Sequence, residues 1–395
     1  MIPDIISTPC FILDEGEMRD SITGFKNALS SHFEKSVVGY SVKTNSLPYC
    51  LKIAKEQGCY AEVVSYHEYQ LALKCGFEKQ HIIYNGPMKS KETFLDAIEN
   101  RAIVNIESNR EIEWLEELPK TKAYQVGIRL NIDISQVSPQ DENHEDDNSR
   151  FGFSAENDSF EQAIKRIKEL PHVQLVGIHT HRTSRTRSLD FYKHVIQYTE
   201  SVIERFGLEL EYWDLGGGYF GMMPNKPTYE EYAKAFLNSL SEKNRQLTII
   251  VEPGNALVAS AFDYVSSVID VKQHNGLYYI TTDGTRNDID PFFHKTNYYK
   301  SFSYQQETGK MVEETQVVCG NTCLEYDRLF TIEGGNRLLT VGDKIIYNRV
   351  GAYTMCLTPL FIHYFPIVYL RNHQGELKII REEWTENEFV NKSIF

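Results

Sequence analysis

The chain has 395 residues, of which 41% are hydrophobic and 24% are charged, so it is long enough to bury a large domain and a smaller one. Its formal net charge of -14 argues against binding to nucleic acid or to an anionic membrane, and it has no apolar run of about 18 residues to span a bilayer. The N-terminal residues lack the pattern of a secretory signal, and seven scattered cysteines exclude a complete disulfide framework, so we expect a reduced, cytoplasmic protein.

Strand and helix patterns alternate through the first two thirds of the chain. Residues 8–14 predict a strand after a proline, and residues 15–33 have helical periodicity. Eight further predicted strands cover residues 37–43, 61–65, 81–85, 102–107, 124–131, 173–181, 212–216 and 247–252. Helical patterns between them cover residues 46–57, 66–74, 91–100, 159–169, 189–206 and 229–243. This alternation predicts an α/β fold, a (β/α)8 TIM-type barrel, with an open doubly wound sheet as the alternative.

The pattern changes after residue 254. Short β-branched runs separated by turns predict an all-β C-terminal domain, and the early strand at residues 10–13 is a candidate member of it. The runs cover residues 261–271, 277–282, 314–318, 344–350 and 367–371. We therefore expect a barrel domain at residues 30–260 and a β domain formed by residues 1–29 and 261–395. The acidic stretch 138–149 has no periodicity and predicts a mobile, solvated loop rather than a metal site.

Residues with side chains suited to catalysis stand at the C-terminal ends of several predicted barrel strands. Lys43 ends the first, His179 and His181 end the sixth, and Glu252 ends the eighth. Active sites of such barrels lie at the C-terminal ends of the strands. A structural role at the start of each loop accounts for other polar strand ends, namely Ser65, Asn85 and Asn131.

Lys43, the glycines and Glu252 together favour one cofactor. A lysine at the end of an apolar run is a candidate amine nucleophile, although a lysine reaching solvent is the alternative. The three consecutive glycines Gly216, Gly217 and Gly218 let backbone N–H groups close on an anion, at the usual phosphate site of a barrel. Lys43 would hold the aldehyde of pyridoxal 5'-phosphate as a Schiff base, and Glu252 would keep its ring nitrogen protonated.

Ordered segments along residues 8–365 carry a resemblance to a known family. The segments are Tyr40–Asn45, Glu62–Ser65 with Glu68, Arg150–Phe153, Gly177–His181 with Ser184, Asp214–Gly218, Glu252–Gly254, Cys319–Cys323 and Gly351–Tyr353. They resemble the fold-type III pyridoxal-phosphate decarboxylases, the group of diaminopimelate and ornithine decarboxylases. The resemblance implies that His181 stacks on the cofactor ring, that Ser184 and Tyr353 contact the phosphate, and that Cys323 is catalytic. It also implies a homodimer in which the β domain of one subunit completes the active site of the other.

Several departures from the family pattern concern the phosphate and the substrate. Asn255 replaces the family's phosphate-binding arginine, and Asp290 stands where a substrate-binding arginine is usual. Thr183 replaces a glycine, and Leu324 replaces an acidic residue that reappears one place later as Glu325. We assign Asn255 to the cofactor site and predict three substrate-binding residues, namely Arg286, Asp290 and Glu325. One of three arginines after the sixth strand is hypothesised to replace the lost phosphate or carboxylate contact, with surface solvation as the alternative: Arg182, Arg185 and Arg187.

The predicted activity is removal of the α-carboxylate of an amino acid by a carboxy-lyase of biosynthetic amino-acid metabolism. Lys43 would form the aldimine, His181 would support the ring, and the partner's Cys323 would protonate the carbanion. The substrate class is a diaminopimelate-, ornithine- or lysine-like amino acid, or one used in siderophore or natural-product assembly. A pyridoxal-phosphate racemase, which would need a tyrosine at position 323, and a non-catalytic cofactor-binding homologue are the alternatives. No metal is expected, because the pair Cys319 and Cys323 has no second pair at ligand spacing.

Overall fold

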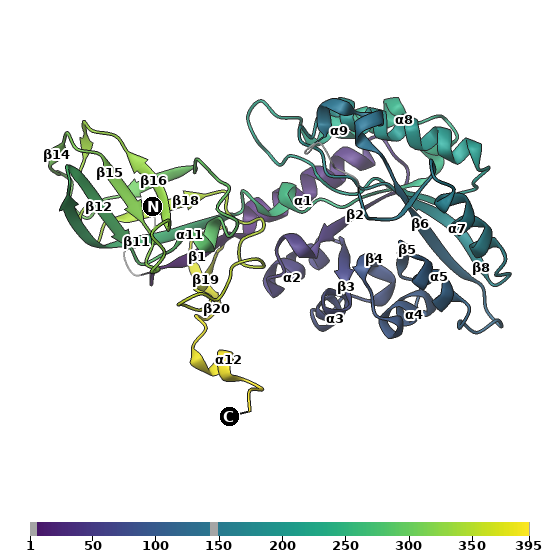
Figure 1. Cartoon of the computed structure of the whole chain (residues 1–395), viewed down its shortest axis with the longest axis horizontal. Coiled ribbons are helices and arrows are strands. Elements are labelled where there is room, and N and C mark those ends of the chain that lie inside the picture. The colour runs from purple at the N-terminus through teal and green to yellow at the C-terminus, as the bar shows by residue number, and fades with distance from the viewer. Residues whose placement is uncertain (1–5, 143–148, 395) are drawn as a thin grey trace. The chain divides into compact units, whose positions relative to one another are not determined.

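The computed structural model describes residues 6–142 and 149–394 (Figure 1). The chain divides into two compact units. One consists of residues 19–257, and the other combines residues up to 18 with residues from 258 onward. Each unit has its own sheet, so each is described by itself.

Residues 19–257 form a closed parallel barrel. Its strands are β2 (Ser36–Ser41), β3 (Tyr60–Ser65), β4 (Ile82–Met88), β5 (Ile103–Ile106), β6 (Tyr124–Asn131), β8 (Val173–His179), β9 (Tyr212–Asp214) and β10 (Thr248–Val251). The order β5-β4-β3-β2-β10-β9-β8-β6 is closed by pairing of β5 with β6. This closure confirms the predicted TIM-type barrel, and the open doubly wound alternative is wrong.

Helices surround the barrel strands in Figure 1 and mostly follow the predicted ranges. They are α1 (Glu15–Ser30), α2 (Pro48–Glu56), α3 (Tyr66–Lys74), α4 (Lys91–Glu99), α5 (Asn109–Leu115), α7 (Ser159–Lys168), α8 (Leu189–Arg205) and α9 (Tyr229–Ser239). Hydroxyl side chains at the N-caps of α3, α4, α8 and α9 accept a backbone hydrogen bond, which fixes where each helix begins. Helix α5 was not predicted.

Two differences from the predicted elements affect the site. The first barrel strand ends at Ser41, and residues 42–44 form a 3-10 turn, so Lys43 lies on a turn after the strand. Strand β8 ends at His179, which leaves His181 in the following loop. Both side chains are thereby released from the alternating in-and-out geometry of a strand.

The acidic stretch predicted to be a loop is ordered where it begins. Helix α6 (Ile134–Val137) and a 3-10 turn (Pro139–Asp141) lead into it, and Asp141 is buried. A solvated loop is therefore the wrong interpretation for Asp141. Residues 143–148 of this stretch lie outside the described residues.

The Tyr212 side chain packs in the interior of the barrel. Tyr212 on β9 is buried, and a Cβ atom placed on Gly177 would lie 2.0 Å from its ring. A Cβ on Gly127 would lie 2.1 Å from the Tyr212 hydroxyl, so the two glycines make the space that this side chain occupies. The Tyr212 hydroxyl donates to Asn105 Oδ1 at 2.8 Å, which connects the barrel core to the polar residues described below.

The other unit is built on a mixed sheet with the main strand order β16-β15-β12-β11-β1-β19-β20, from which β18 and β13 branch at β11. Its strands are β1 (Cys10–Asp14), β11 (Phe262–His274), β12 (Leu277–Thr282), β13 (Lys300–Ser303), β15 (Gln316–Cys319), β16 (Arg328–Ile332), β18 (Lys344–Asn348), β19 (Ile367–Arg371) and β20 (Leu377–Arg381). Strand β1 pairs antiparallel with β11 and parallel with β19, so the first strand of the chain belongs to this C-terminal sheet. The short elements β14 (Met311–Val312), β17 (Asn336–Arg337), α11 (Arg286–Ile289) and α12 (Glu386–Val390) complete the unit. None of the helices in residues 6–142 and 149–394 has the length and hydropathy needed to cross a bilayer.

Candidate active site

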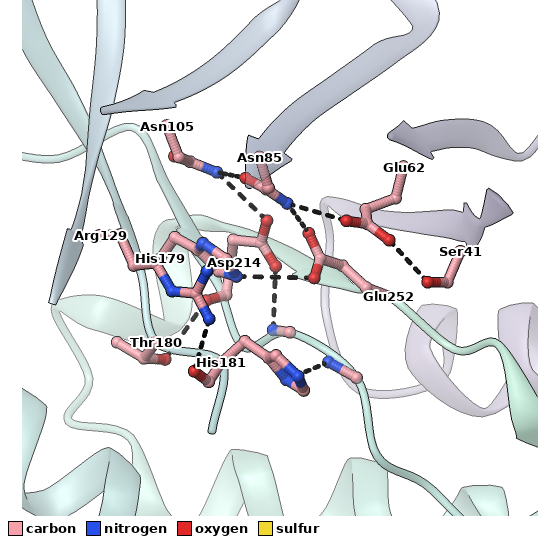
Figure 2. A network of polar contacts seen from close by, with 12 residues as sticks. Ser41, Glu62, Asn85, Asn105, Arg129, His179, Thr180, His181, Asp214 and Glu252 are labelled. Atoms are coloured by element: carbon pink, nitrogen blue, oxygen red, sulfur yellow. Dashed lines mark hydrogen bonds and ion pairs between the residues drawn. The ribbon is translucent and has the colours of Figure 1, made fainter. Parts of the chain in front are cut away.

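Polar side chains from seven of the eight barrel strands meet in one network at the C-terminal end of the barrel (Figure 2). The members labelled in the figure are Ser41, Glu62, Asn85, Asn105, Arg129, His179, Thr180, His181, Asp214 and Glu252. Parallel strands bring their carboxyl ends to one rim, so residues far apart in the sequence become neighbours here. The network therefore stands where an active site is expected in this fold.

Lys43 is held at one side of this network. Its Nζ donates to Glu62 Oε2 at 2.6 Å and to Ser41 Oγ at 2.8 Å, and Ser41 Oγ donates to the same Glu62 oxygen at 2.6 Å. Glu62 is buried, whereas the Lys43 side chain remains 33% exposed. The amine is thus positioned by a buried carboxylate and yet open to an incoming aldehyde.

Glu252 occupies the centre of the network. Asn85 Nδ2 donates to Glu252 Oε1 at 2.5 Å, and its second contact reaches Glu62 Oε1 at 3.4 Å. On the other side, Nε2 of buried His179 lies 3.5 Å from Glu252 Oε2. Asn85 is therefore a member of the site, and its interpretation as a loop-start residue is wrong, while Ser65 does cap helix α3 as that interpretation requires.

Asp214 is a second buried carboxyl beside Glu252. It accepts from the backbone N–H of Gly216 at 2.9 Å, and Asn105 Nδ2 lies 3.5 Å from its other oxygen. Burial, followed by the adjacent Glu252 carboxylate, raises the pKa of Asp214 well above its ordinary value. Two carboxyls that share a dry site cannot both ionise easily, so Asp214 holds a proton next to Glu252.

His181 lies against the glycine turn. Its Nδ1 accepts from the backbone N–H of Gly217 at 3.1 Å, so the neutral ring carries its proton on Nε2. Burial and the Arg129 cation lower the pKa of His181 to about 3. Its ring is parallel to that of His179, with the centroids 6.4 Å apart. His181 is therefore a neutral, flat surface at the mouth of the barrel.

The glycine turn cannot accept side chains. Gly216 and Gly218 have φ of +70° and +99°, and a Cβ on Gly216 would lie 2.4 Å from the His181 Cβ. A Cβ on Gly217 would lie 2.5 Å from the backbone oxygen of Glu252. Only glycine combines positive φ with this closeness, so the turn brings backbone directly against the two predicted cofactor residues.

The ion pair between Arg129 and Glu107, which was not predicted, holds the backbone at His181. Arg129 on β6 donates to both oxygens of Glu107 at 3.0 Å, and its other nitrogen donates to the backbone oxygen of His181 at 3.2 Å. The Arg129 and Lys89 cations overcome the cost of burial and lower the pKa of Glu107. A cation inside an apolar strand needs a buried partner, and this signal in the sequence of β6 was missed.

Buried Asp141 organises the loop that holds Ser184. Its Oδ1 accepts from Ser184 Oγ at 2.7 Å and also from the hydroxyl and backbone N–H of Thr186. These hydrogen bonds outweigh burial and lower the pKa of Asp141. The Ser184 hydroxyl is used within the protein, and its predicted phosphate contact stays a prediction.

The three arginines singled out after the sixth strand have different surroundings. Arg182 is buried, and exposed Arg185 donates to the backbone oxygen of Gln140 at 2.9 Å. Arg187 lies over the ring of Phe220. Asn255 begins the short helix α10 (Asn255–Val258) after the last barrel strand.

The remaining predicted residues belong to the β unit. Cys323 is exposed, and none of the seven cysteines forms a disulfide. Tyr353 is 44% exposed and has φ of +55°. Arg286 Nε donates to Asp290 Oδ2 at 2.9 Å, and that carboxylate also accepts from the Tyr298 hydroxyl. Glu325 is exposed near Cys323, and the predicted roles of these residues stay predictions.

The donor set of the barrel fits pyridoxal phosphate. Lys43 supplies an accessible amine, Glu252 supplies a buried carboxylate, and neither ring nitrogen of His179 makes a hydrogen bond with a described residue. The glycine turn supplies backbone at an anion-binding position of the barrel. Together they can hold an aldehyde, a ring nitrogen and a phosphate group.

Comparisons with known proteins point to the same chemistry. Residues 17–259 match the family model described as pyridoxal-dependent decarboxylase, pyridoxal binding domain. The probable chloroplastic diaminopimelate decarboxylase of Oryza sativa subsp. japonica is 27% identical over 368 residues, which cover 90% of this chain and 73% of that protein. Diaminopimelate decarboxylase of Bacillus subtilis is 26% identical over 405 residues, covering 96% and 90%.

The fold is also found among solved structures. Diaminopimelate decarboxylase from M. jannaschii superposes with a TM-score of 0.85 at 23% identity, covering 99% of this chain and 93% of that one. This likeness concerns the barrel and the C-terminal sheet as a fold. The family match favours neither a racemase nor a non-catalytic homologue.

Proposed function

Because this chain belongs to the pyridoxal-dependent decarboxylases, we propose that Lys43, Glu252 and His181 form the centre at which it removes the carboxylate of an amino acid. The enzyme uses pyridoxal phosphate and acts on a small amino-acid substrate. The single observation that supports this centre is the hydrogen-bonded line from Lys43 through Glu62 and Asn85 to Glu252. It joins the amine and the carboxylate that the chemistry needs.

Each residue of the centre has a separate task. Pyridoxal phosphate, when bound, supplies an aldehyde that condenses with an amine and a ring that accepts electrons when a carboxylate leaves. Glu62 orients the Lys43 amine and accepts hydrogen bonds from it and from Ser41. Asn85 holds the Glu252 carboxylate, which would face the ring nitrogen of the bound cofactor, and neutral His181 would offer its flat face without adding charge.

Phosphate and substrate contacts complete the proposed site. Gly216, Gly217 and Gly218 would hold the phosphate with Ser184, Asn255 and Tyr353, and Arg286, Asp290 and Glu325 would contact substrate. Arg286 and Asp290 already form an ion pair, so a substrate that reaches them must compete with an existing contact. This competition favours a substrate with a strongly polar distal group.

We further propose a homodimer in which Cys323 of one copy donates the proton that replaces the lost carboxylate. A thiol acting as a general acid must be accessible, and Cys323 is exposed. The seven cysteines, none of which forms a disulfide, support a reducing compartment, for which we propose the cytoplasm.

The substrate is tested by a carbon dioxide release screen over basic, acidic and conjugated amino acids. Diaminopimelate comes first, because the relatives named above are diaminopimelate decarboxylases. Lysine-like, ornithine-like and larger siderophore or natural-product amino acids follow. Release of carbon dioxide with formation of one amine supports the proposal, whereas inversion of the α-carbon without gas release would show a racemase. Cofactor absorbance without any turnover across the screen would show a non-catalytic homologue.

A further inference from the structure

Two cations lie over one aromatic ring beside the glycine turn. The Arg187 Cζ lies 5.3 Å from the centroid of the Phe220 ring, and the Lys226 Nζ lies 4.8 Å from the same centroid. Phe220 comes two residues after Gly218, whereas Arg187 comes from the loop after β8. Two loops thus bring positive charge to one point of the barrel rim.

Neither cation has an ion-pair partner among the residues that the structure describes. No carboxylate of residues 6–142 or 149–394 lies at ion-pair distance from Arg187 or Lys226. This is notable in a chain whose formal net charge is -14, because carboxylates are the commoner charged groups. Two like charges near one ring repel each other, and an anion bound by both would offset that cost.

The arrangement is fixed by one buried hydroxyl. Tyr232 on α9 donates to the backbone oxygen of Arg187 at 2.8 Å and accepts from the backbone N–H of Phe220 at 3.3 Å. Arg187 has φ of +52°, which is unfavourable for a residue with a side chain, and its N–H donates to Ser184 Oγ at 2.8 Å. Such an unfavourable conformation persists only where surrounding contacts enforce it, and it is common at binding sites.

The glycine turn is the neighbour of this pair. The Tyr192 hydroxyl donates to the backbone oxygen of Gly217 at 3.1 Å, and a Cβ on Gly218 would lie 3.2 Å from that hydroxyl. Burial raises the pKa of Tyr192 well above 10, and the nearby Arg187 cation opposes part of that increase. Asn255 carries no positive charge, so the segment after the last barrel strand supplies no cation here. The cations near the glycine turn are Arg187, from the loop after β8, and Lys226, from the loop after β9.

We propose that Arg187 and Lys226 form an anion-binding pair for a negatively charged oxygen group, either the cofactor phosphate or a carboxylate-bearing arm of the substrate. The assignment deepens the proposed function and rests on it. Arginine offers paired N–H donors and lysine a mobile point charge, a combination suited to phosphate or carboxylate oxygens. Their cation–π contacts with Phe220 hold both cations at the same ring.

Three variants test the pair: Arg187→Gln, Lys226→Gln and the double substitution. Affinity is measured by absorbance titration with pyridoxal phosphate and with pyridoxal, which lacks the phosphate. Stabilisation of the holoenzyme by the dicarboxylate glutarate is measured by thermal unfolding. Matched controls that remove one positive charge elsewhere on the barrel are Arg166→Gln, whose guanidinium contacts Asn109, and Lys234→Gln, whose ammonium contacts Glu230.

The two sources of the anion give different results. If the pair binds the cofactor phosphate, each single variant weakens pyridoxal phosphate binding about tenfold and leaves pyridoxal binding unchanged. If it binds a substrate arm, cofactor affinity is retained and the double variant loses the glutarate stabilisation of the wild type. Wild-type behaviour of the double variant in all three measurements would overturn the anion site. Absence of cofactor absorbance and turnover in the wild type would instead contradict the proposed function.

Discussion

Replacement of His179 by glutamine is expected to change how stability depends on pH. The His179 side chain is 1% exposed, and burial, followed by the Arg129 cation, lowers its pKa well below 6.5. Glu107 and Glu62 oppose this decrease without reversing it. Below pH 6.5, His179 therefore binds a proton in the unfolded chain but not in the native barrel. The free energy of unfolding decreases as the pH falls.

The magnitude follows from proton linkage. With an unfolded-state pKa of about 6.5 and no protonation of the native ring, the His179 contribution lowers the free energy of unfolding by about 2 kcal/mol between pH 7.5 and pH 5.0. His179→Gln removes this contribution, so its stability should fall about 2 kcal/mol less than that of the wild type over the same interval. The comparison uses the difference between two proteins, which cancels the titration of groups that do not interact with His179.

Urea denaturation of the apoprotein at several pH values measures the effect. Tryptophan fluorescence reports on the barrel, because Trp213 is fully buried on β9 and donates to Thr180 Oγ1. Val176→Ala on β8, the strand that carries His179, is the control, since it removes buried apolar atoms and lowers stability without removing a titratable group. Equal pH dependence in wild type and His179→Gln would refute the reasoning and would mean that the native ring is protonated.

Three further predictions concern the proposed site. Lys43→Ala should abolish both the visible absorbance of bound cofactor and turnover, and retention of that absorbance would place the cofactor amine elsewhere. Cys323→Ala should bind cofactor normally but form amine more slowly, and an unchanged rate of amine release would exclude the thiol as proton donor. Gly217→Ala would place a Cβ 2.5 Å from the Glu252 backbone oxygen, so we expect a loss of about 1–3 kcal/mol in urea denaturation, and a smaller loss would show that the turn relaxes.

Much of the fold could be predicted from the sequence, because the hydrophobic patterns that indicate strands and helices are local. Alternation of apolar strands and amphipathic helices repeats through the barrel, and the predicted positions of all eight barrel strands correspond to observed strands. The ends of elements were less predictable. Lys43 leaves the strand because residues 42–44 form a 3-10 turn, and no residue of that turn is a glycine or proline that would have indicated it.

The candidate site could be predicted only in part, because some of its residues act through contacts with residues distant in the sequence. Lys43, His181 and Glu252 were identified as chemically unusual residues at the ends of apolar runs. Arg129 was missed, although its pairing with Glu107 fixes the backbone of His181. The role of Asp141 was also missed, because an aspartate in an acidic stretch has nothing in its local sequence to distinguish a buried side chain from a solvated one.

The sequence by itself determined the barrel architecture and the types of residue available for chemistry, because periodicity and composition act over short stretches of chain. Only the tertiary structure decided which of those residues share a proton, a hydrogen bond or a charge. Asp214 and Glu252 are 38 positions apart in the sequence, yet their carboxyls lie together and compete for ionisation. Closure of β5 onto β6 completes the ring of strands, and this long-range pairing gathers the strand ends into one buried network.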